Sequence, residues 1–119
     1  MQDKIPEEIR LNRNKDVLIL AYADKIYELT AEYLRVLSPS AEVRGHGAGQ
    51  SKLQTGKRYV TITTLAAVGN YALKIEFSDG HDTGLYDWDY LYQLSVQQQQ
   101  NWAEYMQQLQ LAGASREPC

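Results

Sequence analysis

The sequence predicts an α+β fold, an antiparallel sheet of about five strands with helices packed on one side and a C-terminal helix. Residues 71–77 alternate apolar and polar side chains with the period of two that is typical of a strand with one buried face. Short strand-like runs separated by polar turns fill residues 8–29. Apolar residues at helical spacing follow Thr30 and Asp87, so strands and helices occupy separate stretches of the chain.

The N-terminal strands are expected to form an antiparallel meander. Residues 8–11 alternate and predict a short edge strand, which the Asn- and Asp-rich turn 12–16 follows. The apolar run VLILAY at 17–22 suits a central strand, and the tight connection 23–25 leads to a third strand at 26–29.

A first helix is predicted to begin after Thr30, whose hydroxyl can cap the first turn. Tyr33, Leu34 and Leu37 would then lie on one helical face. The helix is expected to end at Ser38-Pro39, because proline disfavours the α conformation in the residue before it.

The segment 41–57 is predicted to be a long Gly-rich loop, since it holds four glycines and few large apolar side chains. The β-branched, Thr-rich run 59–68 predicts a strand. A hairpin with Gly69-Asn70 at its tip would join it to the strand at 71–77, which has its buried face at Tyr71 and alternate residues.

The stretch SDGHDTGLYDWDYL follows that strand and organises the rest of the chain. Turn residues at 78–81 precede a returning strand over 82–86. Asp87 is a good N-cap for a helix that starts at Trp88.

The C-terminal helix either runs on from Trp88 or breaks near Val96. A helical stripe continues beyond that point through Trp102, Tyr105, Met106 and Leu109. Ala112-Gly113 is expected to end the helix and to leave 114–119 as a frayed tail.

Length and charge bound the class of protein. At 119 residues, the chain is expected to form a single domain, 1–119, with its globular core at 5–95 and its C-terminal helix and tail at 96–119. A net charge of −3 argues against a general nucleic-acid binder, which would carry a basic patch. A local patch could still form from the basic residues that fall close together, but such a cluster is more often a solvated loop than a phosphate-binding track. These residues are Arg44, Lys52, Lys57 and Arg58.

Compartment is inferred from cysteine usage and hydropathy. Cys119 is the one cysteine, so no internal disulfide can form and a reducing compartment fits. No apolar run approaches the roughly 20 residues that a membrane-spanning helix needs. We therefore expect a cytoplasmic protein without a membrane partner.

Glycines near position 45 invite a nucleotide-binding hypothesis that the pattern does not support. The run GHGAG at 45–49 lacks the strand, G-x-G-x-x-G and helix of a dinucleotide site. Gly56-Lys57 lacks the following Ser or Thr of a P-loop.

Two histidines and two carboxylates are the candidates for a metal or acid–base site. Asp79, His81 and Asp82 cluster at one turn, and His46 lies on the Gly-rich loop. The spacing matches no established metal motif, and the Asp79-Gly80 pair is explained by the turn alone. We expect no catalytic residue and no bound cofactor.

Aromatic residues concentrate after the turn, at Tyr86, Trp88, Tyr90 and Tyr92. Core packing explains most such residues, but an exposed patch of them would form a partner surface, because aromatics are enriched at interface hot spots. On a helix, Trp88 and Tyr92 share a face and Tyr90 points elsewhere.

Three segments resemble a known family: SPSAEVRGHGAGQ, LQTGKR and VGNYALKIEFSDGHDTGLYDWDYL. Over roughly residues 5–95, the chain resembles the gamma-butyrobetaine hydroxylase-like N-terminal domain family, here as a small stand-alone bacterial member of unknown function. Similar domains precede the catalytic domain of carnitine-biosynthesis dioxygenases and are appended to a plastid scaffold for iron–sulfur clusters. The resemblance implies an accessory module and does not imply the oxygenase reaction.

The resemblance also bears on a metal. In the dioxygenases, this domain carries a structural zinc held by Cys-x-Cys-x-x-Cys and a later histidine. The corresponding positions here are Ser38, Ser40 and Val43, with His81 as the histidine. Because serine and valine supply no thiolate, structural zinc is predicted to be absent.

Three functional hypotheses remain open. The first is a non-catalytic accessory or protein-interaction module that binds an unidentified protein or itself. The second is an accessory factor in iron–sulfur cluster assembly or carrier function, suggested by the scaffold fusion. The third is a small metal-dependent enzyme that uses His46 and His81 with Asp79 and Asp82.

Overall fold

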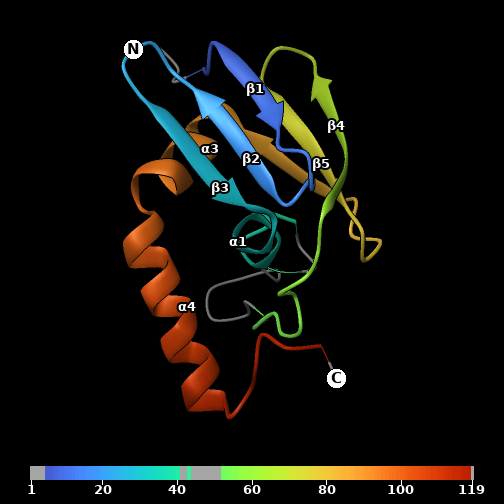
Figure 1. The fold of residues 1–119 in the computed structure, drawn as a ribbon, viewed down its shortest axis with the longest axis vertical. Helices are drawn as coiled ribbons and strands as arrows, with labels where there is room; N and C mark the ends of the chain where they lie inside the picture. The colour runs from blue at the N-terminus through green and yellow to red at the C-terminus, as the bar shows by residue number, and fades with distance from the viewer. Residues whose placement is uncertain (1–4, 41–42, 44–51, 119) are drawn as a thin grey trace.

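The computed structural model describes residues 5–40, 43 and 52–118, and its strands form two antiparallel sheets of three strands each (Figure 1). The first sheet has the order β1-β2-β3 and comprises β1 (Glu8–Leu11), β2 (Val17–Ala21) and β3 (Ile26–Thr30). The second has the order β4-β5-β6 and comprises β4 (Ile62–Val68), β5 (Ala72–Phe77) and β6 (Gly84–Asp87). The helices are α1 (Ala31–Val36), α3 (Trp88–Val96) and α4 (Gln98–Ala112).

The predicted α+β class is confirmed, but the expected single sheet of about five strands is wrong. Each strand pairs with its sequence neighbour, and the α1 helix separates β3 from β4 along the chain. A backbone hydrogen bond of 2.8 Å runs from the Ile62 N–H at the start of β4 to the carbonyl of Lys15 in the β1–β2 turn. Sequence alternation reports that a strand is half-buried, but it does not report which strand lies beside it.

The N-terminal meander is as predicted. Leu18 and Leu20 of β2 and Leu29 of β3 are fully buried, as a central strand and its neighbour require. Asn12 holds the β1–β2 turn, because its side-chain oxygen accepts from the backbone N–H groups of Asp16 and Val17 at 3.0 Å.

The β4–β5 hairpin has its predicted tip, with Gly69 at a φ of 54°. Two details differ from the expectation. β4 begins at Ile62 instead of Tyr59, and a register shift follows immediately. Tyr71 is 55% exposed because it belongs to the turn, so the buried face of β5 starts at Leu73.

Local capping chemistry sets the helix boundaries. The Thr30 hydroxyl accepts from the Tyr33 N–H at 3.1 Å, and the Asp87 carboxylate accepts from the Tyr90 N–H at 2.8 Å. Of the two alternatives for the C-terminal helix, the break near Val96 is the correct one, since α3 ends there and α4 starts at Gln98. Gly113 caps α4 in the left-handed conformation.

Two apolar clusters hold these elements together. The main cluster joins both sheets to one face of α3 through its buried residues Trp88, Leu91 and Leu94. A smaller cluster joins Val36 of α1 to Tyr105 and Leu109 of α4, which extends away from the sheets (Figure 1).

The segment after Gly113 is not the frayed tail that the sequence suggests. Its backbone pairs with residues 56–58: the Gly56 N–H donates to the Ser115 carbonyl and the Arg58 N–H to the Arg116 carbonyl, both at 3.1 Å. Arg116 also binds Glu32 of α1 through two hydrogen bonds of 2.8 and 2.7 Å. The tail through Pro118 therefore belongs to the fold.

Candidate functional site

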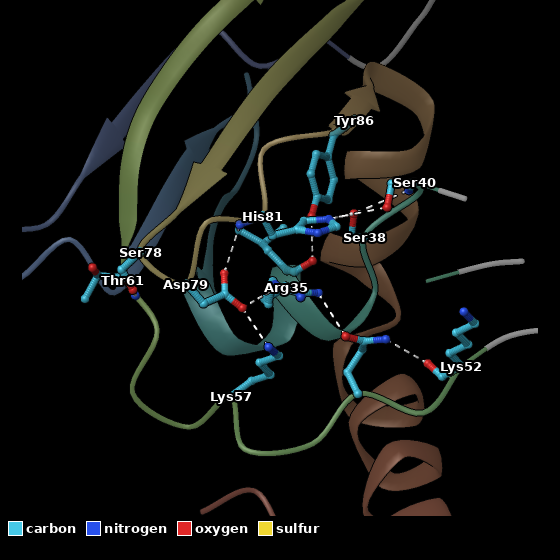
Figure 2. Close-up of polar contacts among 12 residues, drawn as sticks. Arg35, Ser38, Ser40, Lys52, Lys57, Thr61, Ser78, Asp79, His81 and Tyr86 are labelled. Atoms are coloured by element: carbon cyan, nitrogen blue, oxygen red, sulfur yellow. Dashed lines mark hydrogen bonds and ion pairs between the residues drawn. The ribbon is translucent and has the colours of Figure 1, made fainter. Parts of the chain in front are cut away.

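The β5–β6 turn positions the histidine and aspartate that the sequence singles out. Gly80 adopts a φ of 89° and donates its N–H to the Phe77 carbonyl at 3.0 Å. The Phe77 N–H in turn donates to the His81 carbonyl at 2.9 Å, which closes the turn. Asp79 then points toward α1 and the segment around Lys57, whereas His81 points into the protein (Figure 2).

His81 meets two serines at the C-terminal end of α1. Its Nε2 atom lies 2.8 Å from the Ser38 Oγ and 3.4 Å from the Ser40 Oγ (Figure 2). All three side chains are buried, with 6%, 1% and 8% of the residue surface exposed for His81, Ser38 and Ser40. This polar cluster joins two elements that are 43 residues apart in the sequence.

Asp79 is neutralised by two cations. Its Oδ2 accepts from Arg35 Nε at 2.9 Å and from Lys57 Nζ at 2.7 Å. Burial by itself would raise the pKa of Asp79, but the hydrogen bond from Lys57 and the charge of Arg35 outweigh it and lower the pKa to about 2. Arg35 also donates to the Gln54 side chain at 3.1 Å, so the network fastens residues 54–57 to α1.

The candidate metal residues are not brought together by this geometry. His81 faces the serines, Asp79 faces its two cations and Asp82 is exposed. Across residues 5–40, 43 and 52–118, no group of three His, Cys, Asp or Glu side chains could hold a metal ion. His46, the fourth candidate, lies outside the described residues.

Two members of the basic cluster form ion pairs within the protein. Lys57 binds Asp79, and Arg58 binds Glu117 of the C-terminal tail. Lys52 is exposed, and Arg44 lies outside the described residues.

Two of the four aromatic residues, Tyr86 and Trp88, are core residues and therefore cannot belong to an exposed aromatic patch. Tyr86 is fully buried, and its hydroxyl donates to the Leu34 carbonyl at 2.6 Å. Trp88 is 9% exposed and donates its indole N–H to the Asn70 carbonyl at 3.0 Å. Tyr86 faces inward because it alternates with exposed Leu85 along β6.

Tyr90 and Tyr92 are half-buried. Tyr92 packs edge-to-face against Tyr22, with ring centroids 5.4 Å apart, and against Tyr27. The Tyr90 hydroxyl donates to the Leu37 carbonyl at 2.6 Å, and its ring lies between two surface hollows. Tyr90 and Tyr92 therefore contact different parts of the protein.

The larger opening beside Tyr90 is an open cleft of about 430 Å³ between the end of α1 and α4. One wall carries apolar side chains and the other carries polar side chains of α4. Tyr105 closes one side, and its hydroxyl donates to the Gln54 carbonyl at 2.8 Å. The remaining lining residues are Val36, Leu37, Ser38, Val43, Lys52, Leu53, Asn101, Glu104 and Gln108.

Sequence reasoning missed this cleft. The helical stripe predicts that Tyr105 is buried, but nothing in the spacing predicts that α4 lies against the end of α1. The exposed polar residues of α4, such as Gln108, also follow no motif that would single them out.

Family membership follows from the comparison with known proteins. The family described as gamma-butyrobetaine hydroxylase-like, N-terminal, matches residues 9–92, which include the whole β5–β6 turn and both helix caps. The chain belongs to this family. No curated protein matches the chain.

Several solved structures share the architecture of this chain. One solution structure is 47% identical, with a TM-score of 0.88 over 99% of this chain and 94% of the other. A second is 44% identical, with a TM-score of 0.81 over 97% and 86%. A crystal structure from Acidithiobacillus ferrooxidans, a protein of unknown function in the DUF971 family, is 36% identical with a TM-score of 0.64 over 77% and 93%.

The structural zinc that the family resemblance implies does not fit the donor set of this chain. The three positions in question hold two hydroxyls and a valine, and none of these supplies thiolate sulfur. In a tetrahedral site, ligand atoms of one zinc ion stand roughly 3.5 Å apart. The Ser38 and His81 atoms are 2.8 Å apart, the distance of a direct hydrogen bond.

The described helices include none that is both long and apolar enough to cross a bilayer.

Proposed function

We propose that the chain is a non-catalytic accessory module that binds a protein partner through the cleft between α1 and α4. We place this activity in the cytoplasm, where a chain with one cysteine stays reduced. Tyr90, at the mouth of the cleft, is the aromatic contact residue; Tyr92 is set back in its cluster of tyrosines.

The internal use of the polar groups supports a binding role over catalysis. A nucleophile must reach its substrate, yet Ser38 is 1% exposed and bonded to His81. A general acid–base carboxylate needs a pKa near the working pH, whereas Asp79 is held at a pKa of about 2 by Lys57 and Arg35.

The chemistry of the cleft favours an extended peptide as the ligand. Val36, Leu37 and Leu53 offer an apolar wall for side chains. On the α4 side, the exposed amide of Gln108 contains a donor and an acceptor, which matches the alternating N–H and C=O groups of a peptide backbone. The Asn101 amide nitrogen donates to the Tyr33 hydroxyl at 3.1 Å, so Asn101 is held in place at the wall of the cleft. Lys52 and Glu104 add one charge of each sign, so no strongly charged ligand is selected.

Capture from an extract of the source cells tests this proposal, and Gln108 is the position to perturb. Gln108 is exposed on the cleft wall, so Gln108→Arg blocks the cleft without disturbing the core. Gln107→Arg is the matched control, because Gln107 is an exposed neighbour on α4 that does not line the cleft. Circular dichroism confirms that both variants are folded.

We expect at least one protein to be retained by the wild type and by Gln107→Arg and to be reduced at least tenfold by Gln108→Arg. A synthetic peptide from that protein should then bind the purified chain with the same ranking. Identical captured sets for all three forms would contradict the proposal. Concentration-dependent dimerisation that Gln108→Arg abolishes would instead assign the cleft to self-association.

A further inference from the structure

The polar cluster of His81, Ser38 and Ser40 joins the segment after α1 to the β5–β6 turn through buried side chains. Ser38 and Ser40 lie on either side of Pro39, and both hydroxyls reach the same nitrogen of His81. The Ser40 N–H also donates to the Ser38 Oγ at 3.3 Å. Three polar groups thus converge in a space that water reaches poorly.

Neighbouring atoms fix the shape of this space. At Gly84, a Cβ atom would stand 2.9 Å from the Ser38 Oγ and 2.9 Å from a ring carbon of Tyr86. Val43 is also buried, and its N–H donates to the Ser40 carbonyl at 3.1 Å. This bond keeps position 43 close to position 40.

We propose that the hydrogen bond between Ser38 and His81 takes the place of a metal ion as the crosslink between α1 and the β5–β6 turn. The backbone at positions 38, 40, 43 and 81, here called the cradle, keeps the arrangement that would hold such an ion. The distances carry this inference. The Ser40 Oγ is 3.4 Å from the His81 Nε2, close to the separation of roughly 3.5 Å between two ligands of one zinc ion. The Ser38 Oγ is nearer, at 2.8 Å, and needs to move by less than an ångström.

Two consequences follow, and neither depends on the proposed peptide-binding function. The natural chain does not need zinc for stability, since hydroxyls are poor zinc ligands and valine has no donor atom. Thiols at the same positions restore a soft-metal site, because the cradle already directs two side chains at His81.

Cobalt spectroscopy tests the cradle. The variant Ser38→Cys/Ser40→Cys/Val43→Cys is prepared with Cys119→Ser, so that only the introduced thiols are counted. We expect one Co²⁺ per chain, with thiolate-to-metal charge transfer and the intense visible bands of tetrahedral cobalt. Adding His81→Ala should weaken cobalt binding at least tenfold. A folded triple variant that binds no cobalt, or binds it equally well without His81, would contradict the proposal that the backbone keeps the arrangement of a metal site.

The double variant Ser38→Cys/Ser40→Cys guards against misfolding of the triple variant. It offers His81 and two thiols, and should bind cobalt more weakly with an open ligand position. A folded double variant without cobalt binding would overturn the cradle in the same way.

The natural chain tests the other half of the proposal. Its melting temperature should be the same with excess Zn²⁺ and with a chelator, and Ser38→Ala should lower that temperature more than Ser40→Ala does. A zinc-dependent rise that His81→Ala abolishes would overturn the claim that the hydrogen bond has replaced the ion. Equal effects of the two alanine substitutions would contradict the claim that Ser38 makes the main hydrogen bond to His81.

Discussion

The contact between the C-terminal tail and α1 should contribute substantially to stability. Arg116 donates two hydrogen bonds to the Glu32 carboxylate, at 2.8 and 2.7 Å, and its guanidinium lies 5.2 Å from the centre of the Trp102 ring. Glu32 is only 6% exposed. Arg116→Met keeps much of the apolar contact with Trp102 but leaves the buried Glu32 carboxylate without its partner.

The expected loss follows from burial. Removing one partner of a fully buried ion pair costs about 3–5 kcal/mol. The Arg116 side chain is 30% exposed, so water replaces part of the lost interaction, and the expected loss is about 2 kcal/mol. For a domain of this size, that corresponds to a fall in melting temperature of roughly 6–10 °C.

Urea unfolding followed by circular dichroism at neutral pH measures this loss. Arg58→Met is the matched control, because the Arg58–Glu117 pair involves the same tail but is 44% and 48% exposed. We expect the control to lose less than about 0.5 kcal/mol. The double variant Glu32→Gln/Arg116→Met should regain at least half of the loss, because it no longer buries an unpaired charge.

Equal losses for Arg116→Met and Arg58→Met would refute this reasoning. The tail would then contribute no more than an exposed ion pair does, and its pairing with residues 56–58 would carry little free energy.

Three further changes test the site by urea unfolding. The pKa of Asp79 is lowered from 3.8 to about 2, so the stabilisation that Asp79 provides is present above about pH 4 and is lost toward pH 2. Asp79→Asn should therefore reduce the acid-dependent fall in the free energy of unfolding by about 1–2 kcal/mol, and the exposed control Asp82→Asn should not. Gly84→Ala should cost about 1–3 kcal/mol, because the added Cβ lies 2.9 Å from the Tyr86 ring; a neutral result would mean that the ring can move. Tyr86→Phe should cost about 1–2 kcal/mol by leaving the Leu34 carbonyl without its 2.6 Å partner, and an unchanged midpoint would contradict that bond.

Much of the local structure could be predicted because its causes are local. Thr30 and Asp87 cap helices through bonds to residues three positions ahead, and Gly69 sits at a hairpin tip that needs a positive φ. Such features are determined by a few neighbouring residues in the sequence. The α+β class follows from them.

Long-range pairing could not be predicted in the same way. Nothing in the alternation of β4 indicates that it pairs only with β5 and leaves the first sheet separate. The C-terminal tail was expected to fray because it follows the end of the last helix, yet Arg116 binds Glu32, 84 residues away. A residue-level pattern does not encode which distant partner is available.

The site shows the same division. The turn chemistry places Asp79 and His81, but their partners come from α1 and from Lys57. Family resemblance supplied the positions of Ser38 and Ser40, and the distances to His81 confirm that these positions converge on it. Tyr86 is buried because alternate residues of β6 face the core. The aromatic composition of residues 86–92 does not indicate which of the aromatic side chains are buried.

The claim that a hydrogen bond has replaced a metal ion is tested most directly by observing the imidazole ring of His81. Long-range ¹H–¹⁵N correlation spectra of the natural chain report the two ring nitrogens while Zn²⁺ is added in equimolar steps. We predict that the resonances of His81 stay unchanged and that Ser38→Ala shifts the Nε2 resonance. A stoichiometric zinc-induced shift of Nε2 would show that the imidazole still holds a metal and would contradict the account.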